Sequence, residues 1–318
     1  MFPAEMTLCM LLISCPVAAE LDNIEKWAKK RGIPKKDPGR ILIAKWNLTN
    51  FGVQKRGDDH LRMMAKIIGL FDVVAVQEIA DDLTHLRKLL GFLGGNWDNV
   101  YSDIGGNAER LGFIYNSTKV SRKNLDAELV VKGDFSLEVV TDGKKKTYSD
   151  FNLNPYMVDF AAGGFEFTLV NVHLYQALEI VRAQEASAVS KWAAGRSDKK
   201  YPPCEDIIVL GDFNMNRWNM SDATYKELVA HGLSVPEHTT EFASGSSLSG
   251  EAFYDAVTFV SKKTTADCSG QDGVFDFDNA VFPTEWKKLK TESERATFKD
   301  YLRYYLSDHR PLWREFKA

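Results

Sequence analysis

Residues 206–214 read Asp-Ile-Ile-Val-Leu-Gly-Asp-Phe-Asn, an aliphatic run that ends on a glycine, an aspartate and an asparagine. The aliphatic part predicts a strand over residues 206–210. Asp212 and Asn214 then follow the carboxyl end of that strand, which can hold polar side chains rigidly toward a cleft. Glycine, aspartate and asparagine also favour β-turns, so the stretch taken alone fits a plain turn equally well.

Other predicted strands lead into polar side chains in the same way. A near-continuous apolar run is typical of a strand buried on both faces. If such strands share one sheet, their polar ends converge. Each residue alone also fits a surface carboxylate or a half-buried histidine. The strands are residues 41–47, which end on Asn47, residues 71–77, which precede Glu78, and residues 165–174, which contain His173.

Helical and strand patterns alternate along the chain after residue 40. The chain has no internal repeat and no linker long enough to separate domains, so we expect one layered α/β domain over residues 41–318. Helices are predicted to start at Asp58 and at Asp81 or Asp82, and to cover residues 176–196, 221–231 and 292–305. Further strands are predicted over residues 111–115, 127–131, 137–141, 155–161, 254–260 and 312–316.

Composition limits the function classes. The chain has 318 residues, 44% of them hydrophobic and 26% charged, which excludes disorder, collagen and coiled coil as the main architecture. The formal net charge of −4 excludes a broad basic field. Any contact with nucleic acid must therefore be local, or helped by a metal cation that offsets phosphate charge.

The N-terminus predicts a secretory signal peptide over residues 1–19, and hence a secreted or periplasmic protein. Residues 6–15 are apolar, although the preceding segment carries Glu5 and no basic residue. A buried N-terminal strand and a lipid anchor at Cys15 are the alternatives. The run is too short to span a bilayer, so we expect no stable membrane insertion.

Two further features concern the rest of the predicted mature chain. Residues 20–40 form a basic N-terminal extension, for which we expect a short helix with a solvated charged face. Cys204 and Cys268 are the cysteines that remain after cleavage. In an oxidising compartment they either form one disulfide or stay as two unpaired thiols.

The polar residue types suit metal-assisted attack of water on a phosphate ester. Mg²⁺ prefers hard oxygen ligands, and Glu78, Asp212 and Asp308 are the candidates. Histidine can exchange protons near neutral pH, which makes His173 and His309 the acid–base candidates. We expect the other histidines to be structural; they are His60, His85, His231 and His238.

Taken in order, these motifs resemble the endonuclease/exonuclease/phosphatase superfamily, and most closely its deoxyribonuclease I-like branch. The resemblance runs from about residue 41 to the C-terminus. It implies an α/β fold, a four-layer sandwich of two packed mixed β-sheets flanked by helices. The motifs are Ala44-Lys45-Trp46-Asn47, Val76-Gln77-Glu78, Glu109-Arg110-Leu111-Gly112, Asn171-Val172-His173, Gly211-Asp212-Phe213-Asn214, Phe253-Tyr254-Asp255 and Ser307-Asp308-His309.

The resemblance also implies roles. Glu109 would orient His173, and Asp255 would orient His309, so that two His–carboxylate pairs flank the phosphate. Glu78 and Asp308 would hold the divalent ion. Asp212, Asn214 and Asn47 would position the metal, the phosphate or the attacking water. Asp278 also begins an aspartate-plus-strand pattern, but Phe275-Asp276-Phe277 resembles a segment beyond the orienting aspartate, which favours Asp255.

The implied activity is that of a Mg²⁺-dependent phosphodiesterase, with Mn²⁺ or Ca²⁺ as alternative ions. We expect a monomeric endonuclease that hydrolyses DNA, with RNA as an alternative. A sphingomyelinase-like or small-molecule phosphodiesterase or phosphatase is the second hypothesis, and a non-catalytic binding module is the third. The core motifs do not choose among them.

Some positions depart from the deoxyribonuclease I-like branch. Ala80 stands where that branch has a groove-reading arginine, and Asn107-Ala108 replaces its tyrosine. Substrate contacts must therefore come from other residues. The candidates are Arg110, Arg217, Trp218 and the turn Lys144-Lys145-Lys146, for which a solvated surface is the alternative.

Overall fold

The computed structural model describes residues 16–131, 135–141, 143–199, 204–235 and 245–318. Most of the predicted signal peptide and His238 lie outside the described residues. Val17, Ala18 and Ala19 form the start of helix α2 (Val17–Lys30).

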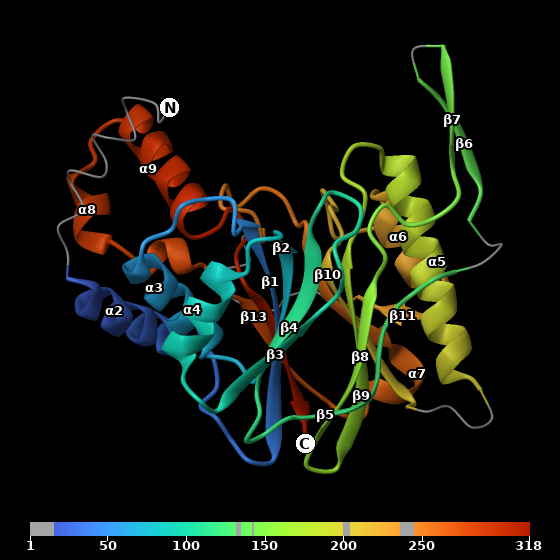
Figure 1. Cartoon of the computed structure of the whole chain (residues 1–318), viewed down its shortest axis with the longest axis horizontal. Helices are drawn as coiled ribbons and strands as arrows, with labels where there is room; N and C mark the ends of the chain where they lie inside the picture. The colour runs from blue at the N-terminus through green and yellow to red at the C-terminus, as the bar shows by residue number, and fades with distance from the viewer. Residues whose placement is uncertain (1–15, 132–134, 142, 200–203, 236–244) are drawn as a thin grey trace.

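Two six-stranded mixed sheets pack against each other (Figure 1). The first has the order β13-β14-β1-β2-β4-β3, and the second has the order β11-β12-β10-β9-β8-β5. The first sheet consists of β1 (Arg40–Phe51), β2 (Val73–Ile79), β3 (Trp97–Tyr101), β4 (Arg110–Asn116), β13 (Cys268–Val274) and β14 (Leu312–Lys317). The second consists of β5 (Ser121–Glu128), β8 (Tyr156–Ala162), β9 (Phe165–His173), β10 (Asp206–Asp212), β11 (Leu233–Ser234) and β12 (Asp255–Val260).

Side chains from both sheets fill the space between them. Ile43 and Phe113 of the first sheet belong to one buried cluster with Phe160, Phe167 and Ile208 of the second. Successive side chains of these strands point to opposite faces of the sheet, and both faces are buried. For this reason β1 and β2 are nearly continuous apolar runs in the sequence.

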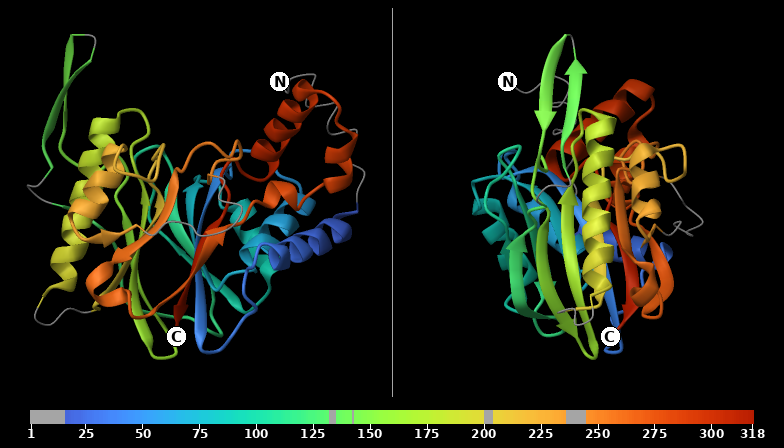
Figure 2. Two further views of the ribbon diagram at one scale, coloured as in Figure 1. Left: turned by 180° about the vertical axis from the view of Figure 1, so that it is seen from behind. Right: turned by 90° about the vertical axis from the view of Figure 1, so that its right-hand side faces the viewer.

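Helices cover the two outer faces, so the predicted four-layer α/β sandwich is confirmed (Figures 1 and 2). The first sheet is covered by α2, α3 (Asp58–Ile68), α4 (Thr84–Leu93), η1 (Phe277–Asn279), α8 (Pro283–Lys288) and α9 (Glu292–Tyr305). The second sheet is covered by α5 (Glu179–Ser197) and α6 (Ala223–Ala230), and the short α7 (Ser261–Thr264) follows β12.

A two-stranded hairpin belongs to neither large sheet. Among the described strands, β6 (Leu137–Thr141) and β7 (Lys144–Tyr148) pair only with each other. They project away from the body of the sandwich, beyond the end of α5 (Figures 1 and 2). We call this element the arm.

Several details differ from the sequence-based expectation. Strand β1 continues past Asn47 to Phe51, and the strand expected at residues 127–131 lies earlier, as β5. Gly57 occupies the N-cap of α3, and Asp58 lies in its first turn rather than capping it. The sequence analysis missed β3, β7, β11 and β13, because β3 and β7 are polar, β11 is very short and β13 contains two glycines.

Cys204 and Cys268 are free, so the disulfide alternative is wrong for this structure. Cys204 is buried next to the second sheet, and its Sγ lies 3.1 Å from the Glu166 carbonyl oxygen. Cys268 lies opposite Phe316 in the first sheet. The two thiols therefore belong to different layers of the sandwich and do not form a disulfide with each other.

The predicted N-terminal extension is only partly a solvated segment. Glu20 on α2 is buried and accepts a hydrogen bond from the backbone N–H of Phe282 at 2.6 Å. Trp27 and Arg31 both bond to Asp276, which ties α2 and its C-terminal end to the segment after β13. Among the described residues, no helix combines the length and apolar character needed to cross a bilayer.

Candidate active site

The candidate site forms where polar residues meet at one end of the sandwich. In the second sheet, Asp212 lies opposite His173 of parallel β9 and opposite Asp255 of antiparallel β12. In the first sheet, Asn47 lies opposite Gln77, next to Glu78. Pairing register therefore brings residues that are far apart in the sequence to the same place.

Unusual backbone conformations accompany the strand ends. Glu78 and Asn214 have positive φ angles of 60° and 50°, which side-chain-bearing residues seldom adopt. Gly211 has φ +143°, and a Cβ there would lie 2.0 Å from the Val172 carbonyl oxygen. Such strained positions persist only where the surrounding structure fixes them, and they concentrate at functional sites.

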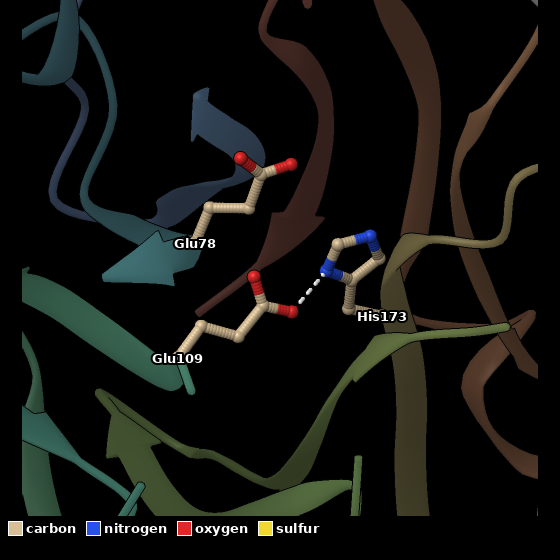
Figure 3. Close-up of side chains that lie close together, drawn as sticks. All are labelled: Glu78, Glu109 and His173. Atoms are coloured by element: carbon tan, nitrogen blue, oxygen red, sulfur yellow. Dashed lines mark hydrogen bonds and ion pairs between the residues drawn. The ribbon is translucent and has the colours of Figure 1, made fainter. Parts of the chain in front are cut away.

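His173 and Glu109 form one His–carboxylate pair. Nδ1 of His173 lies 2.6 Å from Oε1 of Glu109, while Glu78 points toward the same space (Figure 3). Burial lowers the pKa of His173, but the bond to Glu109 and the charges of Asp212 and Glu78 outweigh burial and raise it to about 9. The imidazole is therefore protonated at neutral pH.

His309 and Asp255 form the second pair. Nδ1 of His309 lies 2.9 Å from Oδ2 of Asp255, and the Asp255 side chain is fully buried. Burial lowers the pKa of His309, and the charge of Lys45 acts in the same direction against the opposing effect of Asp212. The two histidines thus have opposite tendencies to hold a proton.

One oxygen of Asp212 connects the two pairs. Its Oδ2 lies 3.7 Å from Nε2 of His173 and 3.6 Å from Nε2 of His309. Burial raises the pKa of Asp212, yet the interactions with His309, His173 and Lys45 hold it below its ordinary value. Asp212 is therefore a carboxylate with a histidine on either side of one oxygen.

Asn47 links the carboxylates of the two sheets. Its Nδ2 donates to Oε1 of Glu78 at 2.8 Å and to Oδ2 of Asp212 at 3.0 Å. Its Oδ1 accepts from the backbone N–H of Thr49 at 2.9 Å, which fixes the amide orientation. Asn214 is held by its own side chain, whose Nδ2 donates to the Leu174 carbonyl oxygen at 2.8 Å.

Lys45 is a buried cation beneath this cluster, and the sequence analysis gave it no role. Its ammonium forms an ion pair with Oδ1 of Asp255, and both side chains are fully buried. Burial lowers the pKa of Lys45 to about 7, although Asp212, Glu78 and Asp308 favour the charged form. A lysine in the middle of the apolar run over residues 41–46 was the signal that could have identified it.

Two groups of side chains could hold a metal ion. Within each group the ligand atoms lie within 4.8 Å of one another, and together they supply mainly carboxylate oxygens, which suit a divalent cation. Asp308 belongs to neither group; it bonds Thr49 Oγ1 at 2.5 Å and Arg303 Nε at 3.1 Å. In the described part of the chain the groups are Glu78, Glu109 and His173, and Asp212, Asp255 and His309.

Comparisons with known proteins agree with one another. No family model matches the chain. A stretch of 199 residues, 55% of this chain, is 26% identical to the endonuclease/exonuclease/phosphatase family domain-containing protein 1 of Xenopus laevis. The matched stretch spans 34% of that relative, so the chain corresponds to about a third of its length.

Solved structures with the same fold cover nearly the whole chain. An endonuclease/exonuclease/phosphatase family protein from Bacteroides thetaiotaomicron matches 87% of this chain and 95% of its own, with 16% identity and a TM-score of 0.53. D. rerio TDP2, complexed with a single-strand DNA product, matches 88% and 99%, with 14% identity and a TM-score of 0.54. The neighbours consistently indicate the endonuclease/exonuclease/phosphatase superfamily.

The superfamily resemblance drawn from the sequence motifs is thereby confirmed, while identities of this size in the solved structures establish the fold alone. Asp278, the other aspartate considered as the partner of His309, instead forms a two-point ion pair with Arg310 at 2.8 and 2.7 Å. Asp276 pairs with Arg31 at 2.7 Å. The structure thus places Asp255, and neither of these two, against His309.

Three of the predicted substrate contacts have different surroundings. Arg110 donates to the Ala80 carbonyl oxygen at 3.0 Å and pairs with Asp81 at 3.1 Å. Arg217 is exposed just beyond Asn214 in the chain. Trp218 is half-buried and donates to the Phe253 carbonyl oxygen at 3.1 Å, next to the motif that carries Asp255. Their role in binding stays a prediction.

His60 and His231 make structural contacts outside the two catalytic pairs. His60 bonds the Tyr301 hydroxyl at 2.7 Å and stacks on Tyr305, and burial lowers its pKa to about 4. His231 bonds the Ser187 hydroxyl at 3.1 Å. Both lie on the helical layers.

Proposed function

We propose that this chain is a Mg²⁺-dependent phosphodiesterase that hydrolyses nucleic acid by attack of water on the phosphodiester, with DNA as the favoured substrate and internal cleavage as the mode. The observation that carries this proposal is the pair of His–carboxylate units on either side of Asp212 Oδ2, at 3.7 and 3.6 Å. Two proton-transfer groups facing one polar space suit a reaction that needs both a base and an acid.

The opposite pKa directions divide the acid–base work between the histidines. His309 is inclined to be neutral, so its Nε2 can take the proton of the attacking water. His173 is inclined to be protonated, so its Nε2 can donate to the departing alkoxide. Glu109 and Asp255 each bond Nδ1 of their histidine, which leaves Nε2 of both rings for proton transfer.

Glu78 and Asp212, one from each group of possible ligands, would hold the divalent ion, and the Asn47 amide that donates to both carboxylates connects them. Asp308 adds a carboxylate at the edge of the same cluster, where its charge acts on Lys45. When bound, the ion would stabilise the charge that develops on the phosphoryl oxygens. Mg²⁺ fits this oxygen-rich set, and Mn²⁺ or Ca²⁺ are the alternatives.

A nucleic acid substrate draws support from the neighbour TDP2, whose structure contains a single-strand DNA product. The resemblance to the deoxyribonuclease I-like branch favours DNA over RNA. We further propose that the protein is monomeric and is exported to the periplasm or the medium, on the strength of the apolar run over residues 6–15. Lipid anchoring through Cys15 is the alternative.

Hydrolysis assays with several phosphate esters test the proposal. Purified whole chain should release nitrophenol from bis(p-nitrophenyl) phosphate with Mg²⁺, and excess EDTA should stop the reaction. His309→Ala and His173→Ala should lower turnover by about 10²–10⁴-fold. His231→Ala is the matched control, because that histidine lies at the end of α6, and it should leave turnover unchanged. Normal turnover in a folded His309→Ala variant would refute the assigned mechanism.

A phosphomonoesterase is the second candidate, favoured by one neighbour. The mannosyl-6-phosphatase of Bacteroides thetaiotaomicron has the same fold, with 15% identity and a TM-score of 0.53 over 87% of this chain. Faster hydrolysis of p-nitrophenyl phosphate or a sugar phosphate than of any diester would favour it. Binding of nucleic acid without hydrolysis, and without any need for a divalent ion, would favour a non-catalytic module.

A further inference from the structure

The arm carries a concentration of basic charge away from the catalytic cluster. Strand β7 reads Lys-Lys-Lys-Thr-Tyr, and Lys144, Lys145 and Lys146 are all exposed. In the described part of the chain, no strand of either large sheet pairs with the arm. It stands above the layers of the sandwich in both views of Figure 2.

Pairing register divides the three lysines between the two faces of the arm. Directly paired residues of an antiparallel hairpin share a face, and faces alternate along each strand. Lys146 pairs with Val139 and Tyr148 with Leu137, which places Lys146, Lys144 and Tyr148 on one face. Lys145 lies on the opposite face with Glu138.

The two faces differ in charge. On the opposite face, Lys145 forms an ion pair with Glu138 at 2.6 Å, which neutralises it. On the face with Tyr148, the Lys146 ammonium lies 4.5 Å from the centre of the Tyr148 ring. Among the described residues, no carboxylate is paired with Lys144 or Lys146. This face therefore presents net positive charge next to an aromatic ring.

Contacts of Tyr148 connect this face of the arm with the chain segment that follows His173. The Tyr148 ring lies 5.8 Å from the Tyr175 ring, and Tyr175 follows His173 by two residues. The backbone N–H of Tyr175 donates to Oε2 of Glu185 at 2.6 Å, and the other carboxylate oxygen accepts from the backbone N–H of Asn152 at 2.7 Å. Glu185 is buried on α5, so it fixes the two chain segments that join the arm to the site.

We infer that the face of the arm with Lys144, Lys146 and Tyr148 is a secondary binding surface for the backbone of a polynucleotide whose scissile phosphate lies between His173 and His309. This inference rests on the proposed phosphodiesterase activity and adds to it a contact surface for the polynucleotide backbone away from the scissile bond. The lysines bind phosphates, and the half-buried Tyr148 ring anchors this face of the arm, because it packs against the hydrophobic core and lies beside Tyr175.

The reach of the arm fits a polymer rather than a small ester. At about 3.3 Å per residue, Lys144 lies roughly 13 Å beyond Tyr148 along β7. That length corresponds to about four base steps of a duplex at 3.4 Å each. A substrate without a backbone beyond the scissile bond cannot extend along the arm. The rate of hydrolysis of small diesters should therefore not depend on these lysines.

Fluorescence anisotropy with a labelled 30-nucleotide DNA, in both single-stranded and duplex form, tests the inference without requiring turnover. The whole chain is compared with Lys144→Gln/Lys146→Gln and with Lys145→Gln as the matched control on the opposite face. All three substitutions lie on an exposed two-stranded element, so the fold should be retained. Binding is measured over a series of salt concentrations with EDTA present.

We expect the double variant to bind DNA more weakly and to lower the slope of log affinity against log salt by about 1.8 for the duplex and about 1.4 for the single strand, which is about 0.9 and about 0.7 for each lost phosphate contact. Lys145→Gln should change the slope by less than half of that amount. Hydrolysis of bis(p-nitrophenyl) phosphate should be the same in all three proteins. An unchanged slope in the double variant overturns the inference, and so does an equal change in Lys145→Gln.

The outcomes separate the arm from the proposed activity. If the double variant hydrolyses the diester normally and binds DNA as the unmodified protein does, the binding role of the arm is refuted and the proposed phosphodiesterase activity is not affected. If the protein binds DNA through the two lysines but has no hydrolytic activity, the proposed phosphodiesterase activity is refuted and the binding role of the arm is not. Cosedimentation with phosphatidylserine vesicles that depends on these lysines, without DNA binding that depends on them, would assign the arm to a membrane surface and overturn the inference.

Discussion

The Lys45 ammonium and the Asp255 carboxylate form a fully buried ion pair, and Asp255 reaches His309 through its second oxygen. Both oxygens of Asp255 are therefore engaged, which leaves the carboxylate one orientation. The cation also lies among several acidic side chains, and Asp212, Glu78 and Asp308 all favour its charged form. Lys45 thus fixes the partner of His309 and offsets part of the negative charge of the site.

Lys45→Met should destabilise the protein by about 3–5 kcal/mol, because it removes one partner of a buried ion pair and leaves Asp255 uncompensated. Unfolding in urea measures the change. Lys36→Met is the matched control: its side chain is 40% exposed, and its partner Asp72 keeps a second cation in Lys119. Equal losses in the two variants would contradict the structural role given to Lys45.

The raised pKa of His173 predicts a specific pH dependence of stability. The folded protein holds the His173 proton up to about pH 9, whereas an unfolded histidine loses it near 6.5. The stabilisation is therefore complete below about pH 6.5 and disappears as pH rises through about 9, by roughly 3 kcal/mol in total. Unfolding of the chain and of Glu109→Gln, measured in EDTA from pH 6 to 10, checks this, since the variant should show a flatter profile.

Mg²⁺ should raise the melting temperature of the protein, because a ligand that binds only the folded state stabilises it. Glu78→Gln should remove most of that shift, since the carboxylate bonded to Asn47 and Asn50 would become a neutral amide. Glu138→Gln is the control, since that carboxylate lies on the arm. Differential scanning fluorimetry gives the result, and a full Mg²⁺ shift in Glu78→Gln would exclude Glu78 as a ligand.

Gly211→Ala should disturb the site through the backbone. The new Cβ would lie 2.0 Å from the Val172 carbonyl oxygen, between two paired strands that carry Asp212 and His173. We expect a loss of about 1–3 kcal/mol in stability and a drop in turnover. Gly195→Ala on α5 is the control, because nothing lies within 4 Å of its Cβ and helices favour alanine. Wild-type stability and turnover in Gly211→Ala would show that the strands can shift without cost.

The sequence predicted the layered fold because the buried strands are apolar throughout and the motifs follow one another in a recognisable order. Strand β2 and its ending at Glu78 are an example. The pairing of Asp255 with His309 depends on tertiary structure, and the resemblance identified it where spacing alone left Asp278 open. The strand expected at residues 127–131 lies at Ser121–Glu128 because the local signals at this sheet edge are weak.

Other features could not be predicted because they depend on distant partners. The arm reads as a lysine-rich turn, and nothing in its sequence indicates that it stands apart from both sheets. Lys45 reads as an interruption of an apolar strand, and its partner Asp255 is more than 200 residues away. The thiols of Cys204 and Cys268 have compatible chemistry, but the fold places them in different layers.

Relaxation of supercoiled plasmid by the whole chain tests the central claim most directly, with Mg²⁺, with excess EDTA and with His173→Ala beside it. We predict nicking with Mg²⁺ only, and a loss of nicking by about 10²-fold or more in the variant. Nicking that persists in EDTA or in folded His173→Ala would contradict the account, as would a folded protein that cleaves neither plasmid nor bis(p-nitrophenyl) phosphate.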